Sequence, residues 1–319
     1  MTGGAGGGGA PMTASFAAQM NTKPNAMTYV SITIVMMGAL MFGIDQNNFG
    51  LVHGMQSFCE FWCPKFDFEG GKTNPQFCSI IGGLQAEEQP AAWTTFNSFG
   101  LNMVSIGMAT GCLTLAPISA RRWGRRITIS LGGLTCFLGC IIVSYISTTV
   151  PVYLIGRFFT GYGCGIACYC LPMYQSEVAT MSIRGLMGSF FQLMVVIGGV
   201  LAIIALGLIE DWKQGFMLPG YAGLVVGLAV WMCPESPRFV IDRFGKDAGR
   251  PVLQRVRNGD IEAELEFLHR NLQEEKQAGS VPISELFTKP GLRLRVFTAC
   301  YLQAAQQFTG VNAFLGYQT

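Results

Sequence analysis

The chain has 319 residues, of which 50% are hydrophobic and only 13% are charged, and its mean hydropathy is +0.38. Because soluble domains carry about 25% charged residues, this composition excludes an ordinary soluble protein and indicates a membrane protein with several spans. The formal net charge of +2 gives no indication of a nucleic-acid partner, and we expect none.

Residues 1–26 are rich in Gly, Ala, Met and Thr and contain Lys23 as their only basic residue, so we expect a disordered cytoplasmic tail without a secretory signal. A membrane span needs about 20 mostly apolar residues. Seven segments meet this requirement: 28–54, 92–118, 127–147, 151–175, 186–209, 215–233 and 296–317.

The loops between these segments alternate in positive charge. The 118–126 loop contains four Arg and the 234–295 segment contains eleven Lys plus Arg, whereas the 55–91 loop contains two Lys against five acidic residues. By the positive-inside rule, the arginine-rich loops and the N-terminus lie in the cytoplasm. Six spans return the chain to that side, in agreement with the charge bias.

The charged segment that follows the sixth span has its own helical periodicity, around 251–257 and 260–276. Leu265, Leu268 and Leu272 recur at three- and four-residue spacing, which indicates short cytoplasmic helices rather than a flexible linker. Before them, Pro237 predicts a cap and turn. The expected organisation is a tail (1–26), a six-span bundle (27–233) with an extracytoplasmic loop (55–91), a cytoplasmic helical insert (234–293) and a partial seventh span (294–319).

The eleven cysteines fall into two groups. Eight lie in or next to apolar runs, where thiols behave as small hydrophobic side chains: Cys112, Cys136, Cys140, Cys164, Cys168, Cys170, Cys233 and Cys300. Cys59, Cys63 and Cys78 lie in the polar 55–91 loop. In an extracytoplasmic loop, two of them would form a disulfide and one would be left over. Three free thiols are an equally open alternative.

Two ionisable residues lie deep in predicted spans. Asp45 lies in the first span, in FGIDQNNFG, and Arg157 opens an apolar run in the fourth span that reaches Pro172 without another charge. An intramembrane charge indicates a functional site and needs a partner, so we expect the two to pair. A nearby guanidinium favours the ionised carboxylate and an apolar environment favours the protonated one, so Asp45 is a candidate proton carrier. A structural ion pair that never titrates is the alternative.

Four motifs occur in a consistent order: RRWGRR (121–126), GRFFTGYGCGIACYCLPMYQSEV (156–178) followed by Arg184-Gly185, PESPRF (234–239) and QQFTGVNA (306–313). With them, residues 28–319 resemble the sugar porter family of the major facilitator superfamily. The resemblance implies an all-α membrane protein with twelve spans in two six-helix halves. This chain would contain the N-terminal six-helix bundle, a cytoplasmic helical insert and the start of a seventh transmembrane helix.

The resemblance also implies transport of a monosaccharide, with hexose favoured, by alternating access. Proton-coupled members use an Asp in span one with the Arg of span four, so Asp45 and Arg157 favour proton symport over facilitative uniport. The residues implied in sugar binding are Phe42, Gln192, Gln306, Gln307 and Asn312. Amides suit this role because they supply both hydrogen-bond donors and acceptors to sugar hydroxyls.

Charges of both signs collect on the predicted cytoplasmic side, and the resemblance implies that they form a salt-bridge latch. They are Arg125, Arg126, Glu177, Arg184, Glu235 and Arg238. Exposed ion pairs contribute about 0–1 kcal/mol each, which suits a latch that must open in every cycle. A purely topogenic role for the arginines is compatible with this interpretation.

No pattern in the sequence indicates an enzyme, a cofactor or a metal site. His53 and His269 have no ligand-forming neighbours, and a GxxxxGK[ST] loop is lacking. We expect an integral protein of the plasma membrane with a sugar and a proton as partners. The alternatives are a uniporter, a non-transporting sugar sensor or an inactive half-length fragment. We favour an incomplete gene model of a twelve-span porter over a half-length product that dimerises.

Overall fold

The computed structural model describes residues 23–66, 78–79, 81–84, 88–278 and 287–309. These residues are mainly helical. The longer helices are α2 (Ala26–His53), α3 (Gln56–Trp62), α5 (Ala91–Leu113), α6 (Leu115–Arg122), α7 (Arg125–Ile141), α8 (Val150–Val178), α9 (Met181–Leu206), α10 (Trp212–Ala229), α11 (Pro237–Phe244), α12 (Lys246–Val256), α13 (Glu262–Ala278) and α15 (Pro290–Phe308). The short elements are η1 (Cys63–Lys65), η2 (Ile81–Gly83), the π-helical turn η3 (Ile142–Ile146), η4 (Val230–Met232), β1 (Lys23–Pro24) and β2 (Arg257–Asn258).

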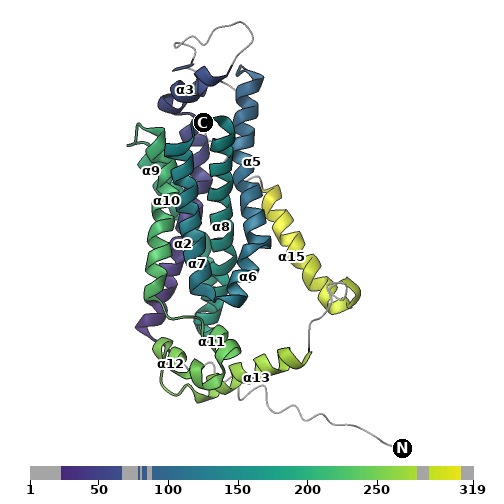
Figure 1. Ribbon diagram of the computed structural model, residues 1–319. Coiled ribbons are helices and arrows are strands. Elements are labelled where there is room, and N and C mark those ends of the chain that lie inside the picture. The colour runs from purple at the N-terminus through teal and green to yellow at the C-terminus, as the bar shows by residue number, and fades with distance from the viewer. Residues whose placement is uncertain (1–22, 67–77, 80, 85–87, 279–286, 310–319) are drawn as a thin grey trace, which may run out of the picture.

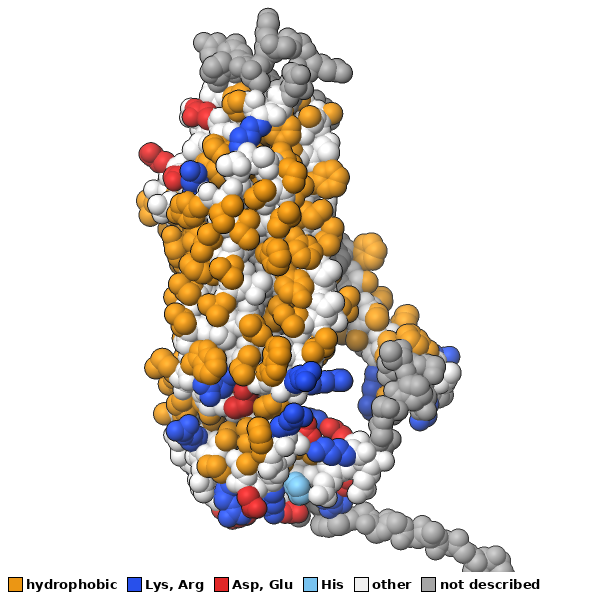
Figure 2. All heavy atoms as spheres, in the orientation of Figure 1, with side chains coloured by type: hydrophobic (Ala, Val, Ile, Leu, Met, Phe, Trp, Pro, Cys, Tyr) orange, Lys and Arg blue, Asp and Glu red, His pale blue; other side chains and the backbone are white. Residues whose placement is uncertain are grey.

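Within the described ranges, six helical segments are long and apolar enough to cross a membrane. They are α2, α5 with α6, α7 with η3, α8, α9, and α10 with η4. They stand side by side as one bundle (Figure 1). Hydrophobic side chains cover the visible face along the bundle, and charged side chains lie toward its ends (Figure 2). The predicted all-α membrane fold is confirmed.

Helix α8 lies at the centre of one side of the bundle, where it packs along α5 and α7, while α2 packs along α9 and α10. Glycines make the α8 contacts close. A Cβ at Gly161 would lie 2.1 Å from the carbonyl oxygen of Val104 on α5, and a Cβ at Gly163 would lie 2.3 Å from the backbone nitrogen of Cys136 on α7. These glycines therefore allow the backbones of α5 and α7 to approach α8 closely.

One end of the bundle carries the 118–126 loop and helices α11–α13, which we call the arginine-rich end (Figure 1). The helices predicted around 251–257 and 260–276 correspond to α12 and α13. Leu265 and Leu272 are buried and Leu268 packs against them, as the periodicity predicted. This end is tied to the start of the bundle, because β1 pairs with β2 and the Thr28 hydroxyl donates to the carbonyl oxygen of Val256.

The turn predicted at Pro237 is wrong, because Pro237 opens helix α11. Ser236 is the N-cap, and its hydroxyl accepts a hydrogen bond from the backbone N–H of Phe239 at 3.4 Å. A proline in the first turn loses no intrahelical hydrogen bond, since the first N–H groups of a helix have no partner there. Pro237 therefore starts a helix instead of ending one.

The opposite end carries what we call the cap, formed by residues 55–66, 78–79 and 81–84 with α3, η1 and η2. Cys63 and Cys78 form a disulfide, and Cys59 is a free, buried thiol. Of the two alternatives for the three loop cysteines, the structure therefore has one disulfide and one leftover thiol. Aromatic rings pack between the cap and the bundle: Phe58, Trp62, Trp93, Phe96, Tyr153, Trp212 and Phe216.

The predicted seventh span differs most from the structure. It was expected over 296–317, whereas helix α15 starts at Pro290 and includes Arg293 and Arg295, and residues 310–317 lie outside the described part. These arginines lower the hydropathy of its first half. Figure 1 shows α15 tilted on one side of the bundle, opposite to the side where α9 lies.

Candidate functional site

A buried ion pair connects α2 and α8 inside the bundle. Arg157 Nη1 lies 3.7 Å from Asp45 Oδ1, and the two side chains are 2% and 1% exposed. The guanidinium also lies over two aromatic rings, 4.9 Å from the centroid of Phe49 and 5.0 Å from that of Phe216. Its Nε donates a long hydrogen bond of 3.5 Å to the carbonyl oxygen of Gly100. The predicted partners therefore face each other, but loosely.

The carboxylate side of this pair is poorly bonded. Neither Asp45 oxygen has a hydrogen-bond partner among the described residues. Buried carboxylates that serve structure are usually hydrogen-bonded on several sides, because an unbonded buried charge is costly. Protonation of Asp45 breaks no hydrogen bond in this arrangement, so the site can lose its negative charge without rearranging other donors.

A second buried pair at the arginine-rich end shows the contrast. Arg257 Nε and Nη2 donate to the Glu264 carboxylate at 3.1–3.2 Å, and Nη1 donates to the carbonyl oxygen of Val178 at 2.7 Å. These bonds fasten α13 to the end of α8. A pair bonded in this way holds helices together, whereas the Asp45–Arg157 pair has its charge attraction, two aromatic faces and one long hydrogen bond from Arg157 to Gly100.

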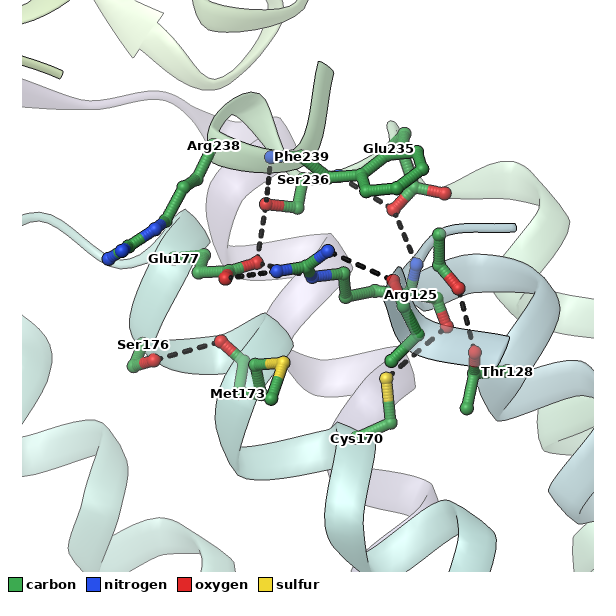
Figure 3. A network of polar contacts seen from close by, with 12 residues as sticks. Arg125, Thr128, Cys170, Met173, Ser176, Glu177, Glu235, Ser236, Arg238 and Phe239 are labelled. Carbon is green, nitrogen blue, oxygen red and sulfur yellow. Dashed lines mark hydrogen bonds and ion pairs between the residues drawn. The ribbon is translucent and has the colours of Figure 1, made fainter. Parts of the chain in front are cut away.

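At the arginine-rich end, three helix ends meet at one carboxylate (Figure 3). Arg125, the first residue of α7, donates from Nε and Nη2 to the two oxygens of Glu177 at 2.9 and 2.8 Å. The Ser236 hydroxyl, which caps α11, donates to the same carboxylate at 2.5 Å. Since Glu177 is near the end of α8, this joint connects α7, α8 and α11.

Glu235 acts as a cap for α7. Its carboxylate accepts from the backbone N–H groups of Arg125 at 3.0 Å and of Arg126 at 3.3–3.4 Å, and from its neighbour Ser236 at 2.9 Å. Gly124 has φ +97°, and a Cβ there would lie 2.5 Å from Glu235 Oε2, so this turn requires glycine. Burial raises the pKa of Glu235, and the three backbone hydrogen bonds oppose that rise.

The other charges predicted for the latch bond elsewhere. Arg126 donates to the carbonyl oxygen of Trp231 at 2.7 Å and lies over its ring. Arg238 pairs with Glu275 of α13 at 2.7 Å, and both are exposed. Arg184 is exposed on α9, with no ion pair within the part of the chain that the structure describes. The structure thus brings together Arg125, Glu177 and Glu235. Arg126 takes part through its backbone N–H, which donates to Glu235, while its side chain bonds to Trp231, and Arg184 and Arg238 lie outside this group.

The predicted sugar ligands are spread over three helices. Phe42 is half-buried on α2, and Gln192 is exposed on α9. Gln306 is exposed on α15, while the side chain of Gln307 and all of Asn312 lie outside the described residues. Because α15 and α9 lie on opposite sides of the bundle in Figure 1, this arrangement does not bring the α15 residues and Gln192 together. Their joint binding site stays a prediction.

We did not predict the polar cluster that lies beneath the cap. The His53 ring lies 2.7 Å from Asn97 Oδ1 through Nδ1 and 2.8 Å from the Tyr153 hydroxyl through Nε2. Helical spacing contained a signal: His53 follows Asp45 by eight residues on α2, and Tyr153 precedes Arg157 by four on α8, which places each on the same helix face as its charged neighbour. The aromatic faces of Phe49 and Phe216 around Arg157 were missed too.

Comparisons with known proteins agree on one family. The model of the family described as "Sugar (and other) transporter" matches residues 30–319. The probable glucose transporter rco-3 of Neurospora crassa is 30% identical over 296 residues, which are 88% of this chain and 46% of that protein. Facilitated glucose transporter member 1 of Gallus gallus is 29% identical, and the match covers 94% of this chain and 60% of that protein. The H(+)/hexose cotransporter 1 of Parachlorella kessleri is 27% identical, and the match covers 88% of this chain and 51% of that protein.

Solved structures have the same fold. The xylose transporter XylE from E. coli, in a partially occluded inward-open conformation, has a TM-score of 0.66 and 22% identity, covering 92% of this chain and 66% of that one. This chain spans about half the length of the curated relatives it matches. The relatives are transporters and not enzymes. From the family match and the relatives, we conclude that this chain belongs to the sugar transporter family.

Proposed function

We propose that this chain supplies the N-terminal half of a proton-coupled monosaccharide transporter, with hexoses as the preferred substrate class. The observation that carries the proposal is the buried Asp45 carboxylate, which has one loose ionic partner and no hydrogen bond among the described residues. The relatives support the substrate class, since they include glucose transporters and an H(+)/hexose cotransporter.

In the proposed cycle, Asp45 alternates between two states. When ionised it pairs with Arg157, and when protonated it releases Arg157 to its other contacts. In the protonated state, the guanidinium keeps its contacts with the rings of Phe49 and Phe216 and with the Gly100 carbonyl oxygen, and it needs no second carboxylate. The buried cation is therefore stabilised in both states, which allows the proton to enter and leave while α2 and α8 move relative to each other.

The sugar would bind beside this pair. Phe42 lies three residues before Asp45 on α2, so it is a neighbour on the helix surface and can form an apolar wall. Gln192 lies on α9, which packs along α2. We propose that both contact the sugar and that Gln306, Gln307 and Asn312 complete the site when the seventh span closes against the bundle.

The orientation follows from charge and from the disulfide. Cys63–Cys78 favours an oxidising compartment for the cap, and the positive charge of the other end favours the cytoplasm. We therefore propose a plasma-membrane protein with a cytoplasmic N-terminus and an extracytoplasmic cap. The joint of Arg125, Glu177 and Ser236 would then close the inward side, and its opening would accompany release of sugar to the cytoplasm.

The test is sugar-driven proton movement by the transporter that contains this chain, reconstituted in proteoliposomes. Asp45→Asn removes the titrating group and keeps its size, so sugar should no longer drive alkalinisation of the medium. The matched control is Asp211→Asn, the same change at the exposed N-cap of α10, where Asn also caps a helix. Equal proton movement by Asp45→Asn and the unchanged protein would contradict symport and favour a uniporter.

A further inference from the structure

His53 lies where three parts of the molecule meet. It is the last residue of α2, and its ring bonds to Asn97 on α5 and to Tyr153 on α8, at 2.7 and 2.8 Å. His53 is 5% exposed, and the centroid of its ring lies 4.4 Å from that of Phe58 in the cap. The thiol of Cys59, also in the cap, donates to the His53 carbonyl oxygen at 3.5 Å.

A neutral His53 ring satisfies both hydrogen bonds in one arrangement of protons. Asn97 Oδ1 can only accept, so His53 Nδ1 carries the hydrogen of that bond. His53 Nε2 is then free to accept from the Tyr153 hydroxyl, which satisfies both ring nitrogens and the phenol. In this arrangement the ring has fixed orientation and no positive charge, and the Tyr153 ring is fixed by the same bond.

From His53, contacts lead directly to the coupling pair. The Phe49 ring lies 4.0 Å from the His53 ring and 4.9 Å from the Arg157 guanidinium, so it is packed between them. Tyr153 precedes Arg157 by one helical turn on α8. The ring of Phe216 is near both, 6.0 Å from His53 and 5.0 Å from Arg157. His53 thus holds the aromatic groups that surround the guanidinium.

We propose that His53 is a positioning residue for proton coupling: it fixes Tyr153 and Phe49 so that the Arg157 guanidinium stays within reach of Asp45. The inference rests on the proposed function, since it assigns His53 a role in the same site. Arg157 needs such support because its own polar bonds are long, at 3.7 Å to Asp45 and 3.5 Å to Gly100. His53 touches neither proton carrier nor sugar and acts only through its neighbours.

The test compares two substitutions at one position. His53→Leu removes both hydrogen bonds, whereas His53→Gln keeps a donor for Asn97 and an acceptor for Tyr153. We expect His53→Leu to lower kcat of proton-driven sugar uptake by at least about tenfold while KM for sugar changes less than about twofold, and His53→Gln to restore most of the rate. His269→Leu, at the other histidine, which is half-buried on α13 and bonds to Gln273 of the same helix, is the matched control and should behave like the unchanged protein.

A second variant covers the case in which His53→Leu does not fold. Tyr153→Phe removes only the hydroxyl that bonds His53 and keeps the ring, and it should lower kcat in the same direction. Uptake by His53→Leu or Tyr153→Phe at the unchanged rate, or equal loss in His53→Gln and His53→Leu, would overturn the inference. Asp45→Asn is measured beside them: if it moves protons as well as the unchanged protein, the proposed function fails instead, and the role of His53 fails with it.

Discussion

Single residues in this molecule show that a buried carboxylate can serve several purposes. Glu264 holds Arg257 with several hydrogen bonds, Glu177 joins three helix ends, Glu235 caps a helix, and Asp45 is left with charge attraction alone. The number of hydrogen bonds decides the role, because a well-bonded carboxylate resists both protonation and movement. Of these four carboxylates, Asp45 alone is deeply buried without a hydrogen bond to either oxygen among the described residues.

Glu235 leads to a prediction about pH. Burial raises the pKa of this carboxyl above 4.5, so the folded protein binds more protons than the unfolded chain between 4.5 and the raised pKa. Stability therefore falls as pH rises through that window. Glu235→Gln keeps an acceptor for the α7 N–H groups and removes the charge, so the fall should become smaller.

The measurement is thermal unfolding in detergent over a series of pH values from 4 upward, in about half-unit steps. Glu88→Gln, at an exposed position, is the matched control. Its unfolding temperature should change with pH as steeply as that of the unchanged protein. Glu235→Ala loses the cap as well and should cost about 0.5–2 kcal/mol at every pH. If the unfolding temperature of Glu235→Gln changes with pH as steeply as that of the unchanged protein, Glu235 is not the buried, charged cap that we describe.

At the scale of elements, helix packing depends on where glycines meet backbone. The Cβ that Gly161→Ala adds would lie 2.1 Å from the Val104 carbonyl oxygen, so α5 and α8 must separate. We expect the free energy of unfolding to fall by about 1–3 kcal/mol, as at other overpacked positions. Gly188→Ala in α9 meets nothing within 4 Å and should be neutral or stabilising by roughly 0.5–1 kcal/mol.

Thermal denaturation of the two variants against the unchanged protein checks this. A lower unfolding temperature is expected for Gly161→Ala alone. If both variants unfold at the same temperature, the α5–α8 contact is not set by this glycine, and the close approach of these helices would need another explanation.

The elements also show what local sequence can and cannot predict. The six spans follow from runs of apolar residues, and α12 and α13 follow from leucine spacing, because both signals are contained within one segment. Helices α3 and α11 were missed, since one is short and aromatic and the other begins at a proline. Helix α15 starts earlier than expected because helix formation tolerates Arg293 and Arg295, which the hydropathy of a span does not.

At the scale of the whole molecule, the bundle separates two different ends. The cap has a disulfide and an aromatic cluster and contacts the surroundings of the Asp45–Arg157 pair through His53, whereas the arginine-rich end has ion pairs and helix caps. The pairing of Asp45 with Arg157 could be predicted, because few other charges occur in the spans. The looseness of that pair and the position of His53 could not, since both depend on distances between helices that no local pattern contains.

The central claim is that Asp45 couples sugar transport to protons, and comparison of exchange with accumulation tests it most directly. In proteoliposomes that contain the complete transporter, sugar counterflow needs no net proton movement, whereas concentrative uptake driven by a pH gradient does. The account predicts that Asp45→Asn retains counterflow and loses accumulation, while Asp211→Asn retains both. Accumulation by Asp45→Asn to the level of the unchanged protein would contradict it.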